Sequence, residues 1–193
     1  MAHITVQEGL PGITGLLEFR LDSAKPIREL TQTLLRGEST LTEAERELIA
    51  TYVSFLNECV FCTTAHAATT NLLYGTDEIV ESVKWNLAQA PISDKMRMLL
   101  IIAGKVQKGG RTVTDEDIAK VKELGATDIE IHDTVLIAAL FCLYNRYVDG
   151  LASFTPADPS FYNALAERLV TRGYVRPEGG YKTYPIEIKE EFK

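Results

Sequence analysis

The sequence has 193 residues, of which 46% are hydrophobic and 24% are charged, and its formal net charge is -7. This composition is typical of a soluble globular protein, and the length predicts a single domain over residues 1–193 with a substantial core. The excess of acidic residues argues against nucleic acid or an anionic membrane as a partner, because both are bound by clustered lysines and arginines.

Targeting signals and cysteine usage give the expected compartment. The longest apolar run, residues 135–143, is about half as long as a bilayer span requires. The first ten residues contain neither the charged nor the apolar region of a signal peptide. We therefore expect a cytoplasmic protein. Three cysteines in such a chain do not form a disulfide framework, so a closely spaced pair indicates redox or metal chemistry.

Apolar residues recur at helical spacing along the chain, between brief Gly, Pro, Ser or Thr signals, which predicts an all-α protein without a long linker. Residues 1–21 contain three glycines and a proline, and we expect them to be irregular. Apolar residues over 27–35 predict a first short helix, which Gly37 would end. Further helices are predicted over residues 42–56, 59–74, 77–89, 94–107, 115–124, 127–151 and 158–173, followed by an extended tail over 174–193.

Two of these helices have a strong signal for their first residue. Thr42 with Glu45, and Thr127 with Glu130, have the spacing of a capping box, in which each side chain satisfies a backbone N–H of the other residue. The helix that follows Thr127 is apolar nearly all round over LIAALF, which indicates that it is central and covered on several sides.

The residues with the clearest chemical potential are Cys59, Cys62 and His66. A helix that begins at Cys59 places all three on one face. A Cys-x-x-Cys pair at a helix N-terminus is a redox arrangement, because the free N–H groups and the helix dipole stabilise the thiolate. The dipole favours Cys59 as the attacking thiol. His66, one turn beyond Cys62, would instead lower the pKa of Cys62, so either sulfur could be the nucleophile.

Glu47 joins this group through the geometry of a helical hairpin. It lies roughly 14 Å before the turn at Asn57, and His66 lies roughly 10 Å after it, so antiparallel helices would bring the two side chains level. A buried carboxylate beside His66 would orient the imidazole and raise its basicity. The predicted relay is Glu47, His66 and Cys62.

The cysteines and the histidine are also compatible with roles that involve no redox chemistry. Taken alone, the Cys-x-x-Cys pair is about as consistent with two core thiols as with a redox role, and the position of His66 favours the redox role. A zinc site would need a fourth ligand besides Cys59, Cys62 and His66, and no second pair supplies one. We therefore expect neither a metal nor a cofactor. The remaining cysteine, Cys142, is predicted to be a small core residue.

The segment ERELIATYVSFLNECVFCTTAH, residues 45–66, resembles the motif of the alkylhydroperoxidase D-like, or carboxymuconolactone decarboxylase-like, family, and in particular its uncharacterised peroxidase-related subgroup. That motif has a Glu twelve residues before the first Cys, then Cys-x-x-Cys, then a His four residues on, and this chain meets every spacing. The resemblance extends through GLPGITGLLEFR, LLRGESTLT and NRYVDGLASF. It implies an AhpD-like helical fold with a central motif-bearing hairpin, assembled as a homo-oligomer of the dimer or trimer/hexamer type.

The resemblance also implies an activity, that of a thiol peroxidase. Cys62 would attack a hydroperoxide and become a sulfenic acid, Cys59 would resolve it as a disulfide, and His66 and Glu47 would relay protons. An external dithiol or thiol-disulfide protein would then reduce the pair. Family members with demonstrated peroxidase activity carry a second His between the cysteines, where this chain has Phe61.

This departure supports an alternative function, that of a protein disulfide reductase or a redox-responsive binding module without peroxidase turnover. Lactone decarboxylation is disfavoured, because that branch of the family lacks the cysteine pair.

The C-terminal tail supports a prediction about assembly. Tyr181, Tyr184, Ile186 and Ile188 have no helix of their own to join, and we expect them to cross onto another subunit.

Overall fold

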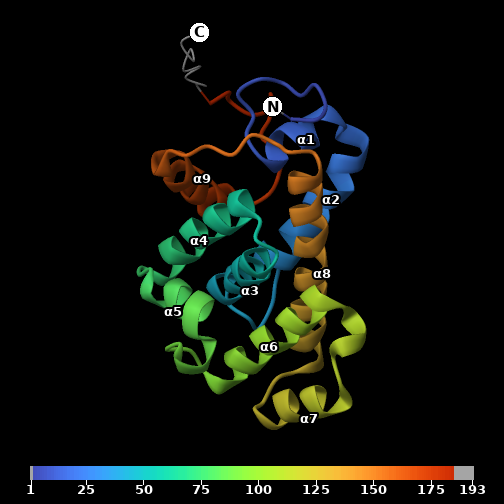
Figure 1. Ribbon diagram of the computed structural model, residues 1–193, viewed down its shortest axis with the longest axis vertical. Helices are drawn as coiled ribbons and strands as arrows, with labels where there is room; N and C mark the ends of the chain where they lie inside the picture. The colour runs from blue at the N-terminus through green and yellow to red at the C-terminus, as the bar shows by residue number, and fades with distance from the viewer. Residues whose placement is uncertain (1, 185–193) are drawn as a thin grey trace.

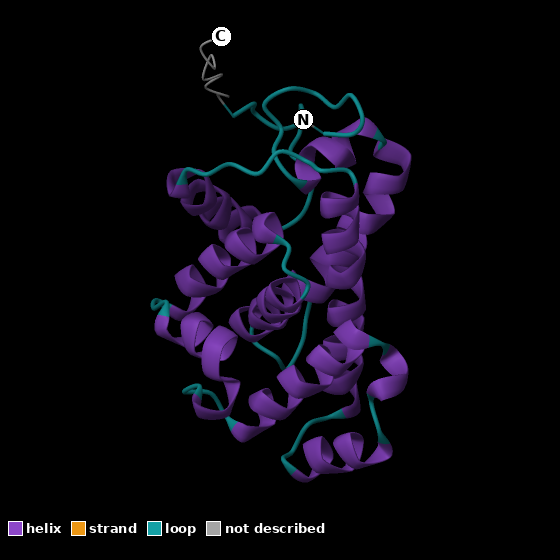
Figure 2. Ribbon diagram, viewed as in Figure 1, coloured by secondary structure: helices purple, strands orange, loops and turns teal. Residues whose placement is uncertain are grey.

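A computed structural model describes residues 2–184, and within this range the chain consists of helices and loops without strands (Figure 2). The all-α prediction is confirmed. The helices are α1 (Ile13–Phe19), α2 (Leu21–Arg36), α3 (Glu43–Leu56), α4 (Val60–Tyr74), α5 (Glu78–Asn86), α6 (Asp94–Lys108), α7 (Asp115–Glu123), α8 (Asp128–Gly150) and α9 (Pro159–Arg172), with short 3₁₀ turns η1 (Leu87–Gln89) and η2 (Gly110–Thr112).

The capping signals place the helix starts correctly. The Thr42 side chain accepts a hydrogen bond from the backbone N–H of Glu45, and the Glu45 carboxylate accepts one from the backbone N–H of Thr42. The same reciprocal pair forms between Thr127 and Glu130 at the start of α8. Helices α3 to α9 therefore begin and end within a few residues of their predicted limits.

The N-terminal region differs from the prediction. Residues 13–19, expected to be irregular, form α1, and α2 begins at Leu21 rather than near residue 27. The glycines of this region had indicated a loop. Gly12, with φ 55°, is instead the N-cap residue of α1, so it ends the loop that precedes the helix. Tertiary burial then stabilises α1, since the Leu16 and Leu17 side chains are buried in the core.

The α3–α4 hairpin lies at the centre of the fold (Figure 1). Helix α3 packs against α2, α4, α5, α6 and α8, and α9 covers the outer side of α4. Helix α8 contacts α1, α3, α4 and α6, as its apolar circumference predicted. No helix within residues 2–184 is both long and apolar enough to cross a membrane.

The core has two parts, and the cysteine pair lies in the smaller one. The larger cluster joins α3, α6 and α8 through residues such as Leu48, Leu99 and Ile137. The smaller cluster packs Cys59 and Cys62 with Leu16, Phe61, Ala65, Val148 and Tyr162. The cysteines are therefore surrounded by apolar side chains from α1, α8 and α9.

The tail has no helix over its described part, residues 174–184, where a turn closes from Gly180 to Pro177, and it returns to its own chain. The backbone N–H of Tyr174 donates to Gln32 Oε1 at 2.7 Å, and that of Tyr184 donates to the Gly9 carbonyl at 2.6 Å. The Tyr181 ring lies 5.4 Å from the Arg28 guanidinium. The two tyrosines that were expected to reach another subunit thus pack within the same chain, and Ile186 and Ile188 lie outside the described residues.

Candidate active site

The turn between α3 and α4 sets the position of the cysteine pair. Glu58 adopts a left-handed backbone conformation with φ 58°, an uncommon conformation for a residue other than glycine. The next residue, Cys59, is the N-cap of α4, and its backbone N–H donates to the Ser54 carbonyl at 3.1 Å. This tight reversal makes α3 and α4 antiparallel neighbours, which the predicted relay requires.

Both cysteines are buried as free thiols, and they differ in what they face. Cys59 is completely enclosed, whereas Cys62 is 3% exposed and lines a cavity of about 80 Å³. The two thiols are close enough to hydrogen-bond with each other, and they are not joined as a disulfide. A molecule that enters the cavity therefore meets the sulfur of Cys62 first, with Cys59 behind it.

The pKa of Cys62 lies well above the ordinary value of a thiol. The main cause is its hydrogen bond with Cys59, to which burial adds, while a hydrogen bond from Asn145 acts in the opposite direction. The sequence had suggested that His66 would lower this pKa, and that expectation is wrong. The reason is that Cys62 shares its hydrogen bond with a second thiol in an apolar cluster rather than with the imidazole.

Glu47 and His66 meet as the hairpin geometry predicted. Glu47 is fully buried on α3, and its Oε2 atom lies 2.7 Å from His66 Nδ1 on α4. Two partners that sequence reasoning missed hold the other oxygen. Arg36 Nη2 donates to Glu47 Oε1 at 2.6 Å, and the Tyr174 hydroxyl donates to the same atom at 2.5 Å.

The partners of Glu47 determine whether its carboxyl group is ionised. Burial opposes ionisation of Glu47, but the charge and hydrogen bond of His66, the charge of Arg36 and the Tyr174 hydroxyl together hold its pKa below the usual value. Burial and the adjacent carboxylate raise the pKa of Tyr174 well above its usual value. Tyr174 is therefore a neutral donor, and Glu47 is a buried anion shared by three groups.

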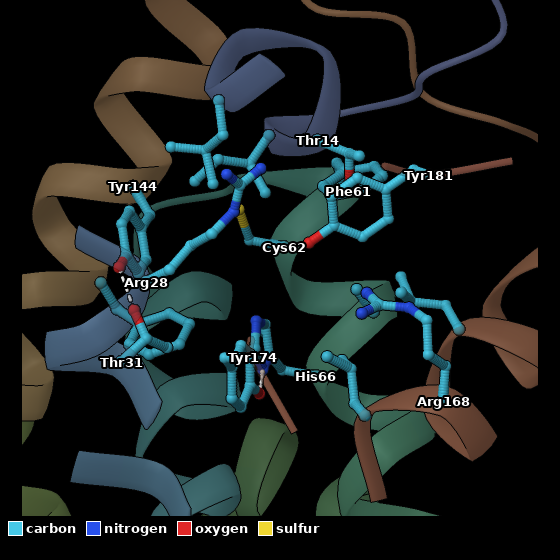
Figure 3. Close-up of a pocket in the computed structure, with 16 residues that line it drawn as sticks. Thr14, Arg28, Thr31, Phe61, Cys62, His66, Tyr144, Arg168, Tyr174 and Tyr181 are labelled. Atoms are coloured by element: carbon cyan, nitrogen blue, oxygen red, sulfur yellow. Dashed lines mark hydrogen bonds between the residues drawn. The ribbon is translucent and has the colours of Figure 1, made fainter. Parts of the chain in front are cut away.

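The imidazole of His66 is fixed between two rings. The Tyr174 ring lies nearly parallel to it at a centroid distance of 6.2 Å, and the Phe141 ring is perpendicular to it at a centroid distance of 4.6 Å. Because ionised Glu47 can only accept a hydrogen bond, His66 Nδ1 carries the hydrogen of this pair, and Nε2 is the nitrogen that Glu47 does not hold. Figure 3 shows this second nitrogen pointing into the cavity, toward the side on which Cys62 lies. The two side chains have no direct hydrogen bond and share the cavity wall.

The groups missed from the sequence come from distant segments. Arg36 ends α2, Tyr174 begins the tail, and Asn145 lies on α8, so none is within the motif itself, although Arg36 and Asn145 lie in the segments LLRGESTLT and NRYVDGLASF that share the resemblance. Asn145 is held by Asn57, whose Nδ2 donates to its Oδ1 at 2.7 Å. Within residues 2–184, no three His, Cys, Asp or Glu side chains are grouped so that they could hold a metal ion.

Comparison with known proteins places this hairpin in a family. The model of the carboxymuconolactone decarboxylase family matches residues 22–86, which include α3, α4 and all four predicted site residues. An uncharacterised peroxidase-related protein from Silicibacter sp. TM1040 is 27% identical with a TM-score of 0.72, over 79% of this chain and 78% of that one. Residues 22–86 of this chain thus match the carboxymuconolactone decarboxylase family, and the chain as a whole has an AhpD-like fold.

Two further structures share the AhpD-like fold. The alkylhydroperoxidase AhpD core of an uncharacterised peroxidase-related protein from Ralstonia eutropha JMP134 is 26% identical with a TM-score of 0.72, over 81% of this chain and 80% of that one. A protein of unknown function from Agrobacterium tumefaciens, 19% identical with a TM-score of 0.66 over 76% of this chain and 99% of that one, supports the fold alone. No curated protein matches the chain.

Proposed function

We propose that this protein is a thiol peroxidase that reduces hydroperoxides through a Cys59–Cys62 dithiol/disulfide cycle. The proposal depends on the arrangement of side chains around the cavity. Cys62 lies on the cavity wall with Cys59 within hydrogen-bonding distance of it, and His66, which is paired with Glu47, lines the same cavity. The peroxidase-related names of its solved relatives agree with this chemistry.

In the first step, the Cys62 thiol transfers its proton to His66 Nε2, and the thiolate attacks the terminal oxygen of the hydroperoxide. The S–O bond forms as the O–O bond breaks, so Cys62 becomes a sulfenic acid and the peroxide is reduced to an alcohol. The leaving alkoxide takes up the proton held by His66. Glu47 stabilises the imidazolium that exists between these transfers, through its 2.7 Å contact with Nδ1.

In the second step, the Cys59 thiol attacks the sulfur of the sulfenic acid. An S–S bond forms and water leaves with the proton of Cys59. An external dithiol then reduces the disulfide and is itself oxidised, which returns both thiols. The two thiols lie within hydrogen-bonding distance of each other, so Cys59 is placed to attack the sulfur of residue 62.

An alternative function is that of a disulfide reductase or redox-responsive binding module. Two observations favour it. The raised pKa of Cys62 lowers the thiolate fraction at neutral pH, which slows attack on a peroxide. Phe61 is buried against the Phe161 and Tyr162 rings, so the position between the cysteines carries no proton donor or acceptor.

A comparison of cysteine variants separates these functions. Reduced wild type, Cys59→Ser, Cys62→Ser and, as a matched thiol control, Cys142→Ser are mixed with cumene hydroperoxide or hydrogen peroxide. Sulfenic acid is trapped with dimedone, and peroxide consumption is followed with dithiothreitol present. The peroxidase mechanism predicts trapped sulfenic acid on Cys62 in Cys59→Ser, none on Cys59 in Cys62→Ser, and continuing turnover in wild type and Cys142→Ser.

Two results would contradict the proposal. Oxidation of one pair per chain without further peroxide consumption would support the redox-responsive module instead. Sulfenic acid on Cys59 in the Cys62→Ser variant would reverse the roles of the two cysteines.

We also propose that residues 1–193 act as one domain, in the cytoplasm, within a homo-oligomer. Light scattering of the purified protein tests the assembly, since a mass equal to that of one chain would exclude it.

A further inference from the structure

The cavity beside Cys62 has an unusual charge for this protein. The sequence carries 27 acidic residues against 20 Lys and Arg, yet the described residues that line the cavity include two arginines, Arg28 and Arg168, and no Asp or Glu. Figure 3 shows the two side chains entering from opposite sides, Arg28 from the side of Thr31 and Tyr144, and Arg168 from α9.

Arg28 is buried with an unused donor. Its side chain is 8% exposed, and its Nη2 atom donates to Glu18 Oε1 at 2.6 Å. That carboxylate is shared, because Arg176 Nη2 contacts Glu18 Oε2 at 2.7 Å. The Nε–H of Arg28 is buried and has no hydrogen-bond partner within the described chain. A buried donor without a partner is costly, so the Arg28 guanidinium has hydrogen-bonding capacity that Glu18 does not use.

Arg168 has no neutralising partner at all within residues 2–184. It forms no ion pair there. Its guanidinium lies 5.2 Å from the centroid of the Tyr181 ring, and it forms a hydrogen bond with the Tyr181 side chain. Burial lowers the pKa of Arg168 from its usual value, which shows that the charge is only partly compensated by its surroundings. The same tyrosine ring lies 5.4 Å from the Arg28 guanidinium, so both arginines flank one segment of the cavity wall.

We propose that the cavity binds a carboxylate between Arg28 and Arg168, and that the substrate of Cys62 is an organic hydroperoxide with a carboxylate group and a short apolar body. A planar guanidinium matches a carboxylate through paired hydrogen bonds. The rest of the lining is mainly apolar, with Ile13, Leu17 and Phe141 among its residues, and the cavity of about 80 Å³ suits a small molecule. The hydroperoxide part rests on the proposed function, whereas the carboxylate site does not.

The carboxylate site is tested without peroxide chemistry. Cys62 is alkylated with iodoacetate, which is anionic, and with iodoacetamide, a neutral analogue of nearly equal size, and each cysteine is quantified by mass spectrometry. The ratio of the two rate constants cancels the thiolate fraction, because both reagents need the same thiolate. We expect Arg168→Gln to lower the iodoacetate/iodoacetamide ratio at Cys62 by about tenfold, the loss expected for one charge-assisted hydrogen bond.

Arg172→Gln is the matched control, because Arg172 lies one turn further along α9, is exposed and does not line the cavity. It should leave the Cys62 ratio unchanged, and Arg168→Gln should leave the ratio at Cys142 unchanged. Equal ratios in wild type and Arg168→Gln would overturn the proposal. An equal fall in Arg168→Gln and Arg172→Gln would also overturn it, because the effect would then come from the loss of any positive charge on α9 rather than from a contact in the cavity.

Equilibrium binding provides a second readout that does not need a reactive thiol. Calorimetric titration with 3-methylbutanoate and with the neutral 3-methylbutanamide should show preference for the acid in wild type and about tenfold weaker acid binding in Arg168→Gln. The proposal is refuted if wild type binds the acid no better than the amide.

A pair of hydroperoxides then separates this inference from the proposed function. The probes are tert-butyl hydroperoxide and 3-hydroperoxy-3-methylbutanoate, which carries a carboxylate in addition. Preference for the acid in wild type, lost in Arg168→Gln, supports both ideas. Turnover of both probes at equal rates retains the peroxidase and refutes the carboxylate site. Carboxylate binding without turnover of either probe retains the site and refutes the peroxidase.

Discussion

Replacing Glu47 by glutamine should lower the free energy of unfolding by about 3 kcal/mol at pH 7. The carboxylate is fully buried and has three partners, Arg36 at 2.6 Å, His66 at 2.7 Å and Tyr174 at 2.5 Å. Glutamine keeps the shape and one acceptor, but it removes the charge opposite the Arg36 side chain, which is 5% exposed. Loss of one member of a buried ion pair costs roughly 3–5 kcal/mol.

The lower end of that range applies because Arg36 retains a second carboxylate. Its Nε atom lies 3.5 Å from Glu43 Oε2, whose side chain is 39% exposed. Glu43→Gln is accordingly the matched control, since it removes a charge from the same helix and the same arginine at a solvated position. We expect it to cost less than about 1 kcal/mol.

The effect of Glu47 should also depend on pH. Its pKa in the folded protein lies below the usual 4.5, so the ionised carboxylate stabilises the fold fully above that pH. This contribution is lost as the pH falls through the lowered folded-state value. The stability difference between wild type and Glu47→Gln should therefore be constant near neutral pH and decrease in the acid range, while Glu43→Gln shows little dependence.

Urea denaturation followed by circular dichroism, at several pH values and with the slope m compared among variants, measures these differences. A Glu47→Gln variant that is as stable as Glu43→Gln would refute the reasoning. So would a Glu47→Gln destabilisation that is the same at pH 3 as at pH 7, because the cost would then come from packing rather than charge.

Two further predictions concern the cysteine cluster. Cys59→Ala should lower the pKa of Cys62, because the hydrogen bond with the Cys59 thiol is the main cause of the raised value. The pH profile of iodoacetamide alkylation at Cys62 measures this pKa, and an unchanged midpoint would contradict the prediction. Gly12→Ala should cost about 3 kcal/mol, because the backbone has φ 55° and a Cβ would lie 2.1 Å from the Phe61 ring. The control Gly75→Ala, at φ 74° with no atom within 4 Å of a Cβ, should cost only about 1 kcal/mol in urea denaturation, and equal costs would exclude the steric contribution.

Local signals in the sequence were sufficient for most of the fold. Capping boxes and apolar periodicity act within a few residues, so the starts of α3 and α8 and the pairing of Glu47 with His66 follow from spacing alone. The same reasoning missed α1, where the stabilising burial of Leu16 depends on residues far along the chain.

The chemistry around the motif was decided by tertiary structure. Arg36 and Tyr174 bind Glu47 from α2 and from the tail, and although Arg36 lies in the LLRGESTLT segment of the resemblance, no spacing rule relates either residue to Glu47. The same holds for the pKa of Cys62, which is raised because the helices bury it beside Cys59 instead of joining it to the imidazole. Hydrogen bonds and burial depend on distances in space, whereas sequence patterns report neighbours along one helix. The sequence thus determined which residues form the hairpin, and packing determined their charge and which sulfur faces the cavity.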